Sequence, residues 1–565
     1  MTTLLTDNLP LLAGAPNGIK KLRELILELA VRGKLVPQDP NDEPANELLK
    51  RIAEEKAQLV AEGKIKKQKP LAEISEEDNP FELPRKWEWV RLGEIAEIIR
   101  GVTYNKSDAS DAALPEYAPL LRGNNINRIL NFDRPVFVPK KLISEQQYIR
   151  VGDIVIAMSS GSADLVGKAA QATASFDGAF GAFCGVVRSR TSGLFELFGL
   201  FFQTPLYRSR AAGHGKGIGI NNLQKSVLET LEIPIPPLAE QHRIVAKVDE
   251  LMALCDRLET QQADAESAHA KLVQALLDSL TQARDAVDFA QSWQRLTAYF
   301  HTLFTTESSI DALKRTLLQL AVMGKLVPQD PSDESAEKLL KRISDHRSKY
   351  REKKQKSLSD ISEVAKPFEL PSQWAWATLP AIGELARGKS RHRPRNDSSL
   401  YAGGNVPLIQ TGDVARANGV VKTHSAMYNA KGVEQSRLWP AGTMCITIAA
   451  NIADSALLGF DACFPDSVVG FIPDLPELDV RYFEFFLRTA KTHLEAFAPS
   501  TAQKNINLEI LGLLSVPLPP AKEVHRIVAK VDQLMALCDQ LKARLTHARQ
   551  LNEQLASTLV EQAVA

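Results

Sequence analysis

The chain has 565 residues, 44% of them hydrophobic and 24% charged, so it is long enough for three or four ordinary globular domains. Its 68 basic side chains balance 68 acidic ones, so no overall field draws it to nucleic acid, and any such binding must come from local basic patches. No uncharged apolar run reaches the roughly 18 residues of a membrane span, the N-terminus is a poor signal peptide, and the five cysteines form no C-x-x-C pair, which together favour a cytoplasmic protein with reduced thiols and no membrane partner.

The first predicted element is an amphipathic helix over residues 18–32. Its apolar residues Leu22, Ile26 and Leu29 share one face, and Gly33 stands where the end of a helix favours glycine. The next stretch, PQDPNDEPA, predicts a turn and the acidic start of another helix. These helices form the first of five predicted parts, residues 1–75.

The second predicted part, residues 76–238, is a compact α/β globule. The run VGDIVIAM predicts a short strand after a glycine, and ELFGLFFQTPLYRSRAA at 196–212 predicts one amphipathic helix. The paired prolines of EIPIPPLAEQ end a last strand.

A long helix opens the third predicted part, residues 239–366. It starts near Glu240 and extends to about Ala283, which at ~1.5 Å per residue is roughly 60 Å, against ~34 Å for one turn of DNA. A helix of that length can hold two globules one to two DNA turns apart. In its first part, apolar residues follow one another at alternating intervals of four and three residues, which is the spacing of a coiled coil. They are Ile244, Val248, Leu251, Cys255 and Leu258.

The rest of the chain repeats this plan, with a globule over residues 367–520 and a heptad helix over 521–565. LAVRGKLVPQDPNDE at 29–43 returns as LAVMGKLVPQDPSDE at 320–334, and HRIVAKVDELMALCDRL at 242–258 returns as HRIVAKVDQLMALCDQL at 525–541, each with two differences. One unit of about half the chain was therefore duplicated. The simplest closure pairs the C-terminal helix with the N-terminal helices and gives a pseudo-two-fold ring.

The two copies are alike in their flanks and differ in their middles, residues 90–220 and 377–503. A constant frame with two different middles is suited to presenting two distinct surfaces in one fixed geometry. We therefore predict an α+β protein in which two α/β-type domains are separated by long antiparallel coiled-coil helices, with a pseudo-two-fold internal repeat.

The stretch GELARGKS at 383–390 matches the phosphate-loop pattern G-x-x-x-x-G-K-[ST]. The aligned stretch of the first copy lacks the first glycine and the lysine, LPAIGELARG predicts a short helix closed by Gly388, and Pro394 stands where a phosphate loop needs a helix. We interpret it as a basic loop for DNA phosphates, or as a solvated loop, and expect no nucleotide and no other cofactor. The candidates in it are Arg387, Lys389, Arg391, Arg393 and Arg395.

Polar loops at matching places in the two middles are candidates for base and phosphate contacts. LLRGNNINR at 120–128 matches LIQTGDVAR at 408–416, and AAGHGKGIGINNLQKS at 211–226 matches STAQKNINLEI at 500–510. Asn and Gln can bond adenine and Arg can bond guanine, whereas the structural alternative is a set of helix-capping turns. The candidates are Arg100, Tyr104, Lys106, Arg122, Asn124, Asn125, Arg128, Lys216, Asn221, Asn222, Gln224, Gln410, Thr411, Arg416, Gln503, Lys504 and Asn505.

Neither middle carries a signature of catalysis. The patterns [DN]-P-P-[YFW], H-E-x-x-H and G-x-S-x-G do not occur, so we expect no catalytic and no metal residues. The basic runs KIKKQK at 64–69 and REKKQK at 351–356 are interpreted as solvated linkers, with phosphate contact as the alternative.

Two variable blocks that open near P..W.W, close before IPIPPLAEQHRIV and lead into a heptad helix resemble the specificity subunit of a type I restriction–modification enzyme. The resemblance implies a non-catalytic subunit whose two target recognition domains read one half each of a bipartite, asymmetric site in double-stranded DNA. It implies helices that set the spacer and dock two modification subunits, which methylate adenine with S-adenosylmethionine. Restriction subunits, which act as motor and nuclease, join that core.

One stretch of the second copy departs from this pattern. PPAKEVHRIV lacks the Ala-Glu-Gln of the first copy, which bears on the local contact with a partner. The alternatives are a P-loop enzyme and a non-DNA two-domain ligand-binding scaffold on a coiled-coil spacer. The zero net charge predicts weak DNA binding by the isolated chain, since partner subunits would supply most of the attraction to phosphates.

Overall fold

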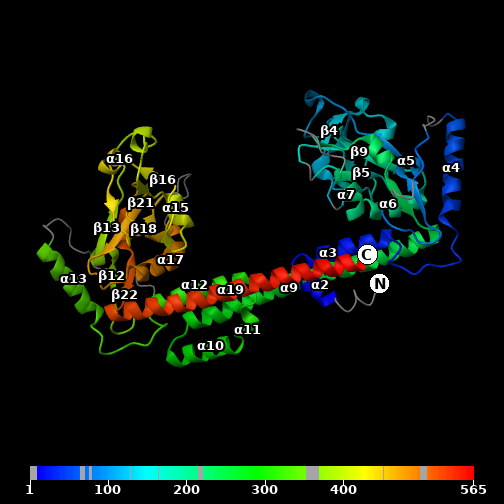
Figure 1. Cartoon of the computed structure of the whole chain (residues 1–565). Coiled ribbons are helices and arrows are strands. Elements are labelled where there is room, and N and C mark those ends of the chain that lie inside the picture. The colour runs from blue at the N-terminus through cyan, green and yellow to red at the C-terminus, as the bar shows by residue number, and fades with distance from the viewer. Residues whose placement is uncertain are drawn as a thin grey trace. The chain divides into compact units, whose positions relative to one another are not determined.

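The computed structural model describes residues 9–63, 70–74, 79–127, 129–162, 165–213, 221–350, 368–449, 451–496 and 506–564 (Figure 1). The chain forms two compact units, one of Met1–Ala265 with Ala548–Ala565 and one of Glu266–His547. Each unit combines helices with a mixed globule, which confirms the predicted α+β class and internal repeat. The five-part division is finer than these two units and stays a prediction, as does the ring.

The helical part of the first unit contains both ends of the described chain. It consists of α2 (Leu9–Gly14), α3 (Gly18–Val31), the start of α9 (Leu238–Thr281) and the end of α19 (Ala521–Val564). One face of α3 packs on the heptad residues of α9 and on Ala556 of α19, and the buried residues of this core include Leu22, Ile26, Leu29, Ile244, Val248, Leu251 and Cys255.

A lysine of α3 fastens the end of α19. Lys21 Nζ donates to Ser557 Oγ at 2.7 Å and to the carbonyl oxygen of Glu553 at 3.2 Å. Figure 1 shows α3 beside the last turns of α19. Helix α3 and the last turns of α19 therefore meet within this unit.

The helical part of the second unit is built in the same way from α12 (Glu307–Val322), the end of α9 and the start of α19. Leu313 and Leu317 of α12 pack with Leu277 of α9 and Cys538 of α19 in one core. Two further helices, α10 (Ala286–Ala298) and α11 (Phe300–Leu303), precede α12. Neither helix was predicted from the sequence.

Glycine ends both amphipathic frame helices, as predicted. Gly33 and Gly324 have φ of +66° and +72°, the left-handed conformation that glycine adopts without strain. A Cβ at either position would lie 2.5 Å from Cγ of Pro84 or Pro371. The predicted second helices follow as α4 (Ala45–Ala61) and α13 (Ala336–Tyr350).

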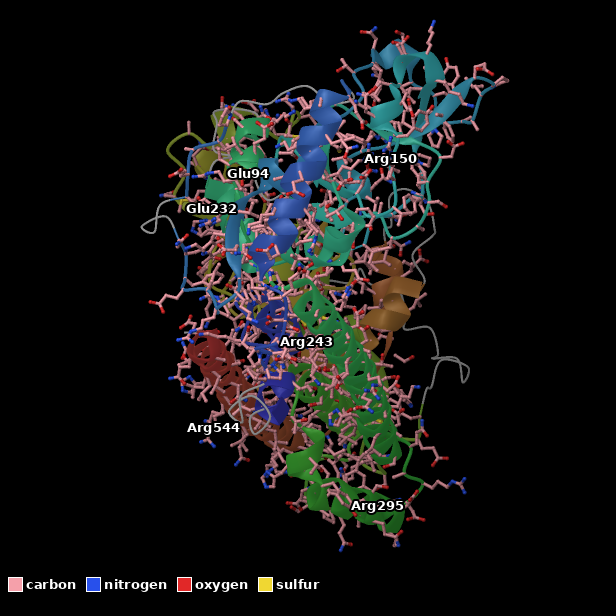
Figure 2. The ribbon with its side chains drawn as sticks, turned by 90° about the vertical axis from the view of Figure 1, so that its right-hand side faces the viewer. Glu94, Arg150, Glu232, Arg243, Arg295 and Arg544 are labelled. Atoms are coloured by element: carbon pink, nitrogen blue, oxygen red, sulfur yellow. The ribbon has the colours of Figure 1, made fainter. Side chains whose placement is uncertain are left out.

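A buried carboxylate joins three segments of the first unit. Glu240 of α9 is 1% exposed and accepts hydrogen bonds from Trp87 Nε1 at 3.0 Å and Gln38 Nε2 at 2.6 Å. One turn further along α9, Arg243, which is labelled in Figure 2, pairs with Asp42 at 2.5 Å. Burial raises the pKa of Glu240, and the two donors oppose that rise.

The second unit repeats this cluster with Glu523, which is fully buried. Its carboxylate accepts from Trp374 Nε1 at 3.1 Å and from Gln329 Nε2 at 2.8 Å, and Arg526 pairs with Asp333 at 2.7 Å. The divergent PPAKEVHRIV stretch therefore keeps its glutamate at the position of Glu240. We call these two groups, Gln38–Trp87–Glu240 and Gln329–Trp374–Glu523, the carboxylate clusters.

The first globule contains two small sheets and two short antiparallel ladders. The ladders pair β1 (Glu88–Arg91) with β11 (Glu232–Ile235) and β6 (Ser159–Ser160) with β10 (Asn221–Asn222). In spatial order the larger sheet holds β2 (Ala96–Arg100), β9 (Cys184–Ser189), β5 (Ile154–Ala157) and β7 (Ala169–Gln171), and the smaller holds β4 (Val136–Pro139), β3 (Tyr117–Leu121) and β8 (Ala179–Phe180). Its α-helices are α5 (Leu92–Ile95), α6 (Phe195–Phe201), α7 (Pro205–Gly213) and α8 (Lys225–Glu229).

The second globule follows the same plan. Its ladder pairs β12 (Ala375–Thr378) with β22 (Ser515–Leu518). One sheet holds β13 (Gly383–Arg387), β21 (Val468–Pro473), β18 (Met444–Thr447), β19 (Ser455–Leu458) and β15 (Val420–Val421), and the other holds β16 (Ala426–Tyr428), β14 (Val406–Leu408), β20 (Ala462–Cys463) and β17 (Leu438–Trp439). Its α-helices are α14 (Leu379–Ile382), α15 (Thr411–Arg416), α16 (Ala430–Glu434), α17 (Val480–Ala496) and α18 (Leu508–Leu513).

Two predicted helices were wrong. Residues 196–212 form α6 and α7 rather than one helix, because Pro205 lacks an N–H and instead starts the second helix. LPAIGELARG ends its helix at Ile382, and residues 383–387 form β13, which pairs in register with β21 from Gly383↔Pro473 to Arg387↔Val469. This long-range pairing overrides the local helical pattern.

We predict that Glu240→Ala lowers the free energy of unfolding of the first unit by about 3 kcal/mol, because the buried N–H of Trp87 and the amide of Gln38 lose their acceptor. Chemical unfolding followed by tryptophan fluorescence measures this. The control is Glu250→Ala, which removes an exposed ion pair with Lys247 and costs less than about 0.5 kcal/mol. Equal effects of the two substitutions would contradict a structural role for the carboxylate cluster.

Candidate nucleic-acid interface

The larger sheets of the two globules end in the same backbone arrangement. Gly101 N, just after β2, donates to Cys184 O at 3.1 Å, and Gly388 N, just after β13, donates to Val468 O at 2.9 Å. A Cβ on Gly101 would lie 2.1 Å from Gly181 O, so only glycine permits this approach of the two segments. Arg100 and Arg387, the last residues of β2 and β13, are exposed at this end.

Equivalent polar loops follow β3 and β14. Asn125 Oδ1 accepts from Arg122 N at 2.9 Å, and Asp413 Oδ2 accepts from Gln410 N at 2.9 Å, so in each loop a side chain caps the backbone N–H of the residue three positions before it. Arg122 and Gln410 themselves are exposed. The loops therefore share a fold and differ in the side chains that they present.

Asn125 is built into its loop. It is 2% exposed, and its Nδ2 donates to Asn131 O at 3.0 Å and to Asp133 O at 2.9 Å while its Oδ1 is held by Arg122 N. With both donor hydrogens and the oxygen engaged, this amide is unsuited to the base contact that we expected of it. The neighbouring Asn124 is exposed, so its amide remains a candidate for a base contact.

In the second globule the loop carries an ion pair. Arg416 donates to Asp413 Oδ1 at 2.7 Å, and Ser425 Oγ donates to Asp413 Oδ2 at 2.8 Å. The side chain of Arg416 is nevertheless 71% exposed, so its guanidinium is held in place and open to solvent. Thr411 is half-buried at the start of α15.

The basic loop after β13 exposes all five of its candidate side chains, Arg387, Lys389, Arg391, Arg393 and Arg395. Arg395 pairs with Asp466 at 2.7 Å, and Arg393 donates to the carbonyl oxygens of Ser390 and His392. Residues 383–387 are strand and no α-helix opens at Ser390, so the stretch lacks the strand–loop–helix geometry of a phosphate loop.

An aspartate orders the far end of this basic loop. Asp397 accepts from the Ser399 backbone N at 2.9 Å, and its other oxygen lies 2.7 Å from His392 Nε2. These contacts, first that with Ser399, lower the pKa of Asp397 from its ordinary 3.8 to about 2. The carboxylate is therefore charged at neutral pH and holds the loop.

The remaining candidates divide into three groups. Asn222 and Gln224 are exposed, and Ser159 Oγ donates to Asn222 Oδ1 at 2.8 Å. Lys106 is also exposed, whereas Tyr104 is half-buried. Asn221 is described only by its backbone, which pairs with Ser160. Outside the described residues lie Arg128, Lys216, Gln503, Lys504 and Asn505 and the runs 64–69 and 351–356.

The capping alternative is confirmed at Asn507. Its Oδ1 accepts from Ile510 N at 2.8 Å at the start of α18.

The structure adds one residue that the sequence analysis missed. Phe183, in the turn between β8 and β9, is 68% exposed, whereas Phe180 and Cys184 on either side are buried. It stands in the apolar run AFGAFCGVV, where nothing in the pattern separates an exposed phenylalanine from a buried one.

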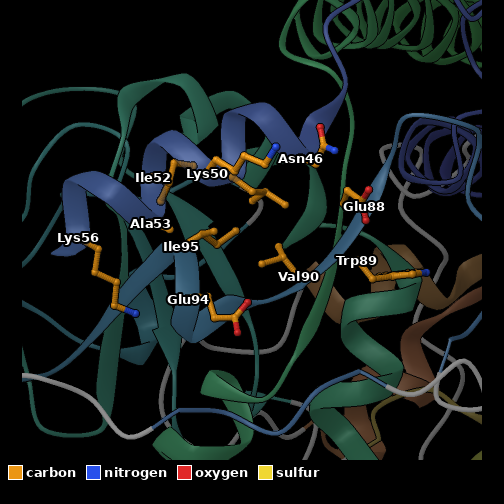
Figure 3. A pocket seen from close by; sticks show the side chains of 11 residues that line it. Asn46, Lys50, Ile52, Ala53, Lys56, Glu88, Trp89, Val90, Glu94 and Ile95 are labelled. Carbon is orange, nitrogen blue, oxygen red and sulfur yellow. The ribbon is translucent and has the colours of Figure 1, made fainter.

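None of these candidates lines the hollow beside α4, whose wall is formed by α4 and by residues 88–95 (Figure 3). Among the described residues no three His, Cys, Asp or Glu side chains are grouped as metal ligands. No helix in the described part of the chain is long and apolar enough to span a bilayer.

The sequence matches the family model described as "type I restriction modification DNA specificity domain" twice, at residues 84–266 and 371–548. The chain belongs to this family. The EcoEI and EcoAI type I restriction enzyme specificity subunits of Escherichia coli are each 36% identical to it, over 97% of this chain and 94% of theirs. The resemblance drawn from the repeated motifs is thus confirmed, and the chain is a type I specificity subunit with two target recognition domains.

A solved structure, the HsdS subunit from Thermoanaerobacter tengcongensis, aligns with this specificity subunit at 18% identity and a TM-score of 0.43. The alignment covers 86% of this chain and 98% of that chain.

We predict that Asn125→Ala destabilises the first globule by about 2 kcal/mol, because two carbonyl oxygens and one N–H lose the buried amide that bonds them. Asn124→Ala is the matched control and leaves the unfolding midpoint unchanged, since that side chain is exposed. Thermal unfolding distinguishes the two variants. A stable Asn125→Ala protein would show that the amide is not needed to fold the loop.

We also predict that the basic loop loosens in acid. The pKa of Asp397 is lower in the folded chain, so its contribution is complete above pH 3.8 and is lost as the pH falls through about 2. Asp397→Asn reproduces this loss at pH 7. Hydrogen exchange of the amides of residues 389–400 measures it, with Glu434→Gln as an exposed control. Unchanged protection in Asp397→Asn would refute this role.

Proposed function

We propose that this specificity subunit reads a bipartite, asymmetric site in double-stranded DNA, one half with each globule. The observation that supports this is one backbone arrangement carrying different exposed side chains, such as Arg122 and Asn124 against Gln410 and Arg416. A homodimer has identical readers and so suits a palindrome, whereas one chain with two unlike readers suits an asymmetric sequence. Clustered polar side chains at matching loops also weigh against the ligand-binding scaffold.

We propose that the duplicated helices dock two modification subunits and, through them, the restriction subunits. Four leucines in the described parts of α9 and α19 are about half exposed and would give a partner apolar contacts. They are Leu272, Leu537, Leu551 and Leu555. Methyl transfer, with its S-adenosylmethionine, and cleavage would then belong to those partners, and this chain would contribute binding alone.

The charge distribution supports DNA binding in which partner subunits take part. The chain has no net charge, and two of its exposed candidate arginines, Arg395 and Arg416, are already paired with aspartates. Partner subunits around the duplex would supply most of the attraction to phosphates, so the isolated chain would bind DNA weakly. None of the five cysteines forms a disulfide and all are buried, which suits the reducing cytoplasm in which we place the protein.

The test is an exchange of one variable block in a host that also makes the modification subunits. Replacing residues 80–236 by the corresponding block of another type I specificity subunit should change one half of the methylated motif. The other half should stay as it was, because residues 367–516 are untouched. Genome-wide mapping of methylated adenines reads both halves at once.

The reciprocal exchange of residues 367–516 is the matched control and should change only the second half. A motif in which both halves change after a single exchange would refute independent readers. A host in which the intact complex yields no methylated motif would refute the proposed function itself.

A further inference from the structure

The exposed Phe183 has a structural counterpart in the second globule that the sequences of the two middles do not reveal. Phe183 O accepts from Met158 N at 2.9 Å, and Ser467 O accepts from Ile448 N at 3.0 Å. Met158 and Ile448 each directly follow the central strand of their sheet, β5 or β18. The two carbonyl groups therefore stand at the same place in the two globules.

The neighbouring contacts agree with this correspondence. The residues after Phe183 and Ser467 pair with the ends of the central strands, Cys184 with Ala157 and Val468 with Thr447. The carbonyl oxygens of Met158 and Ile448 also accept matching bonds, at 2.7 Å from Leu223 N and at 3.0 Å from Ile506 N. Phe183 and Ser467 are thus equivalent in the backbone network although their side chains are unlike.

An arginine is common to both places. Arg100 pairs with Gly185 in the β2–β9 ladder, and Arg387 pairs with Val469 in the β13–β21 ladder, two residues beyond the turn position in each case. Both side chains are exposed, and neither makes an ion pair in the part of the chain that the structure describes. The position thus combines one constant cation with one variable side chain.

Backbone hydrogen bonds hold the turn in which the ring of Phe183 is exposed. Its carbonyl oxygen is bonded by both Met158 N and Ser159 N, and Cys184 N donates to Gly181 O at 2.8 Å. An aromatic side chain fixed in water forgoes the free energy that its burial would release. A partner that covers the ring recovers that energy.

We propose that Phe183 is a specificity-determining residue that contacts the C5-methyl group of a thymine in the first half-site. Ser467 takes the same place over the second half-site with a hydroxyl, and Arg100 and Arg387 hold the adjacent phosphates. Phenylalanine is suited to the thymine methyl, serine can hydrogen-bond to any base pair, and phosphate contacts position a protein without reading sequence. This inference rests on the proposed function, since it assigns residues within the same reading surface.

The first experiment maps methylated motifs in hosts that carry the complete complex with one substitution each. Phe183→Ser should relax one position of the first half and leave the second half intact, and Ser467→Phe should alter only the second half. Arg100→Gln and Arg387→Gln are the comparison, and each should lower methylation at all sites without relaxing any position. Phe183 is exposed, so Phe183→Ser should keep the unfolding midpoint of the wild type.

The second experiment uses duplexes in which each thymine of the first half is replaced in turn by deoxyuridine, which lacks the methyl group. The wild-type complex should bind one such duplex about fourfold more weakly, the change expected for one methyl group. The Phe183→Ala complex should bind that duplex and the thymine duplex equally well.

The outcomes separate the two levels of the proposal. A wild-type host without any motif would refute the proposed function. A wild-type motif that Phe183→Ser leaves equally strict would refute the role of Phe183 alone. Relaxation without sensitivity to any deoxyuridine would overturn the thymine contact.

Discussion

Two buried carboxylates hold the helical frame and the globules of this specificity subunit together. A carboxylate removed from water is stable only when donors surround it. Glu240 and Glu523 each find a tryptophan from the segment that enters the globule and a glutamine from the turn after the frame helix. Each globule is therefore joined to its helices by the same set of contacts, although the sequences of the two globules differ.

What the two globules have in common is the arrangement and hydrogen bonding of the backbone. Gly101 and Gly388 allow two segments to come closer than any side chain would permit, and matched hydrogen bonds fix the turns beside them. Asn125 and Asp413 differ chemically yet cap equivalent loops in the two globules. The side chains at these turns, the exposed Phe183 and the half-buried Ser467, take no part in those backbone bonds.

The frame was predictable because its signals are local. Heptad spacing, glycine at helix ends and short β-rich runs each act over a few residues, and the structure has α3, α9, α12, α19, β5 and β18 where these signals lie. Pro205 is also a local signal, because proline favours the start of a helix over its interior. The prediction of one continuous helix over 196–212 did not take it into account.

What the sequence could not provide depends on long-range contacts. Residues 383–387 have a helical pattern and become a strand only because β21 pairs with them. The adjacent amides of Asn124 and Asn125 are identical in type, and only the fold exposes one and buries the other. The same holds for Phe180 and Phe183, since exposure is a property of the folded sheet.

The turn at Phe183 is secured by main-chain atoms alone, so its stability is nearly independent of which amino acid stands there. A single nucleotide change in that codon can therefore pass through the folding requirement untouched. If Phe183 reads a base as proposed, such a change would alter the recognised DNA sequence in one step, without a compensating change elsewhere in the fold.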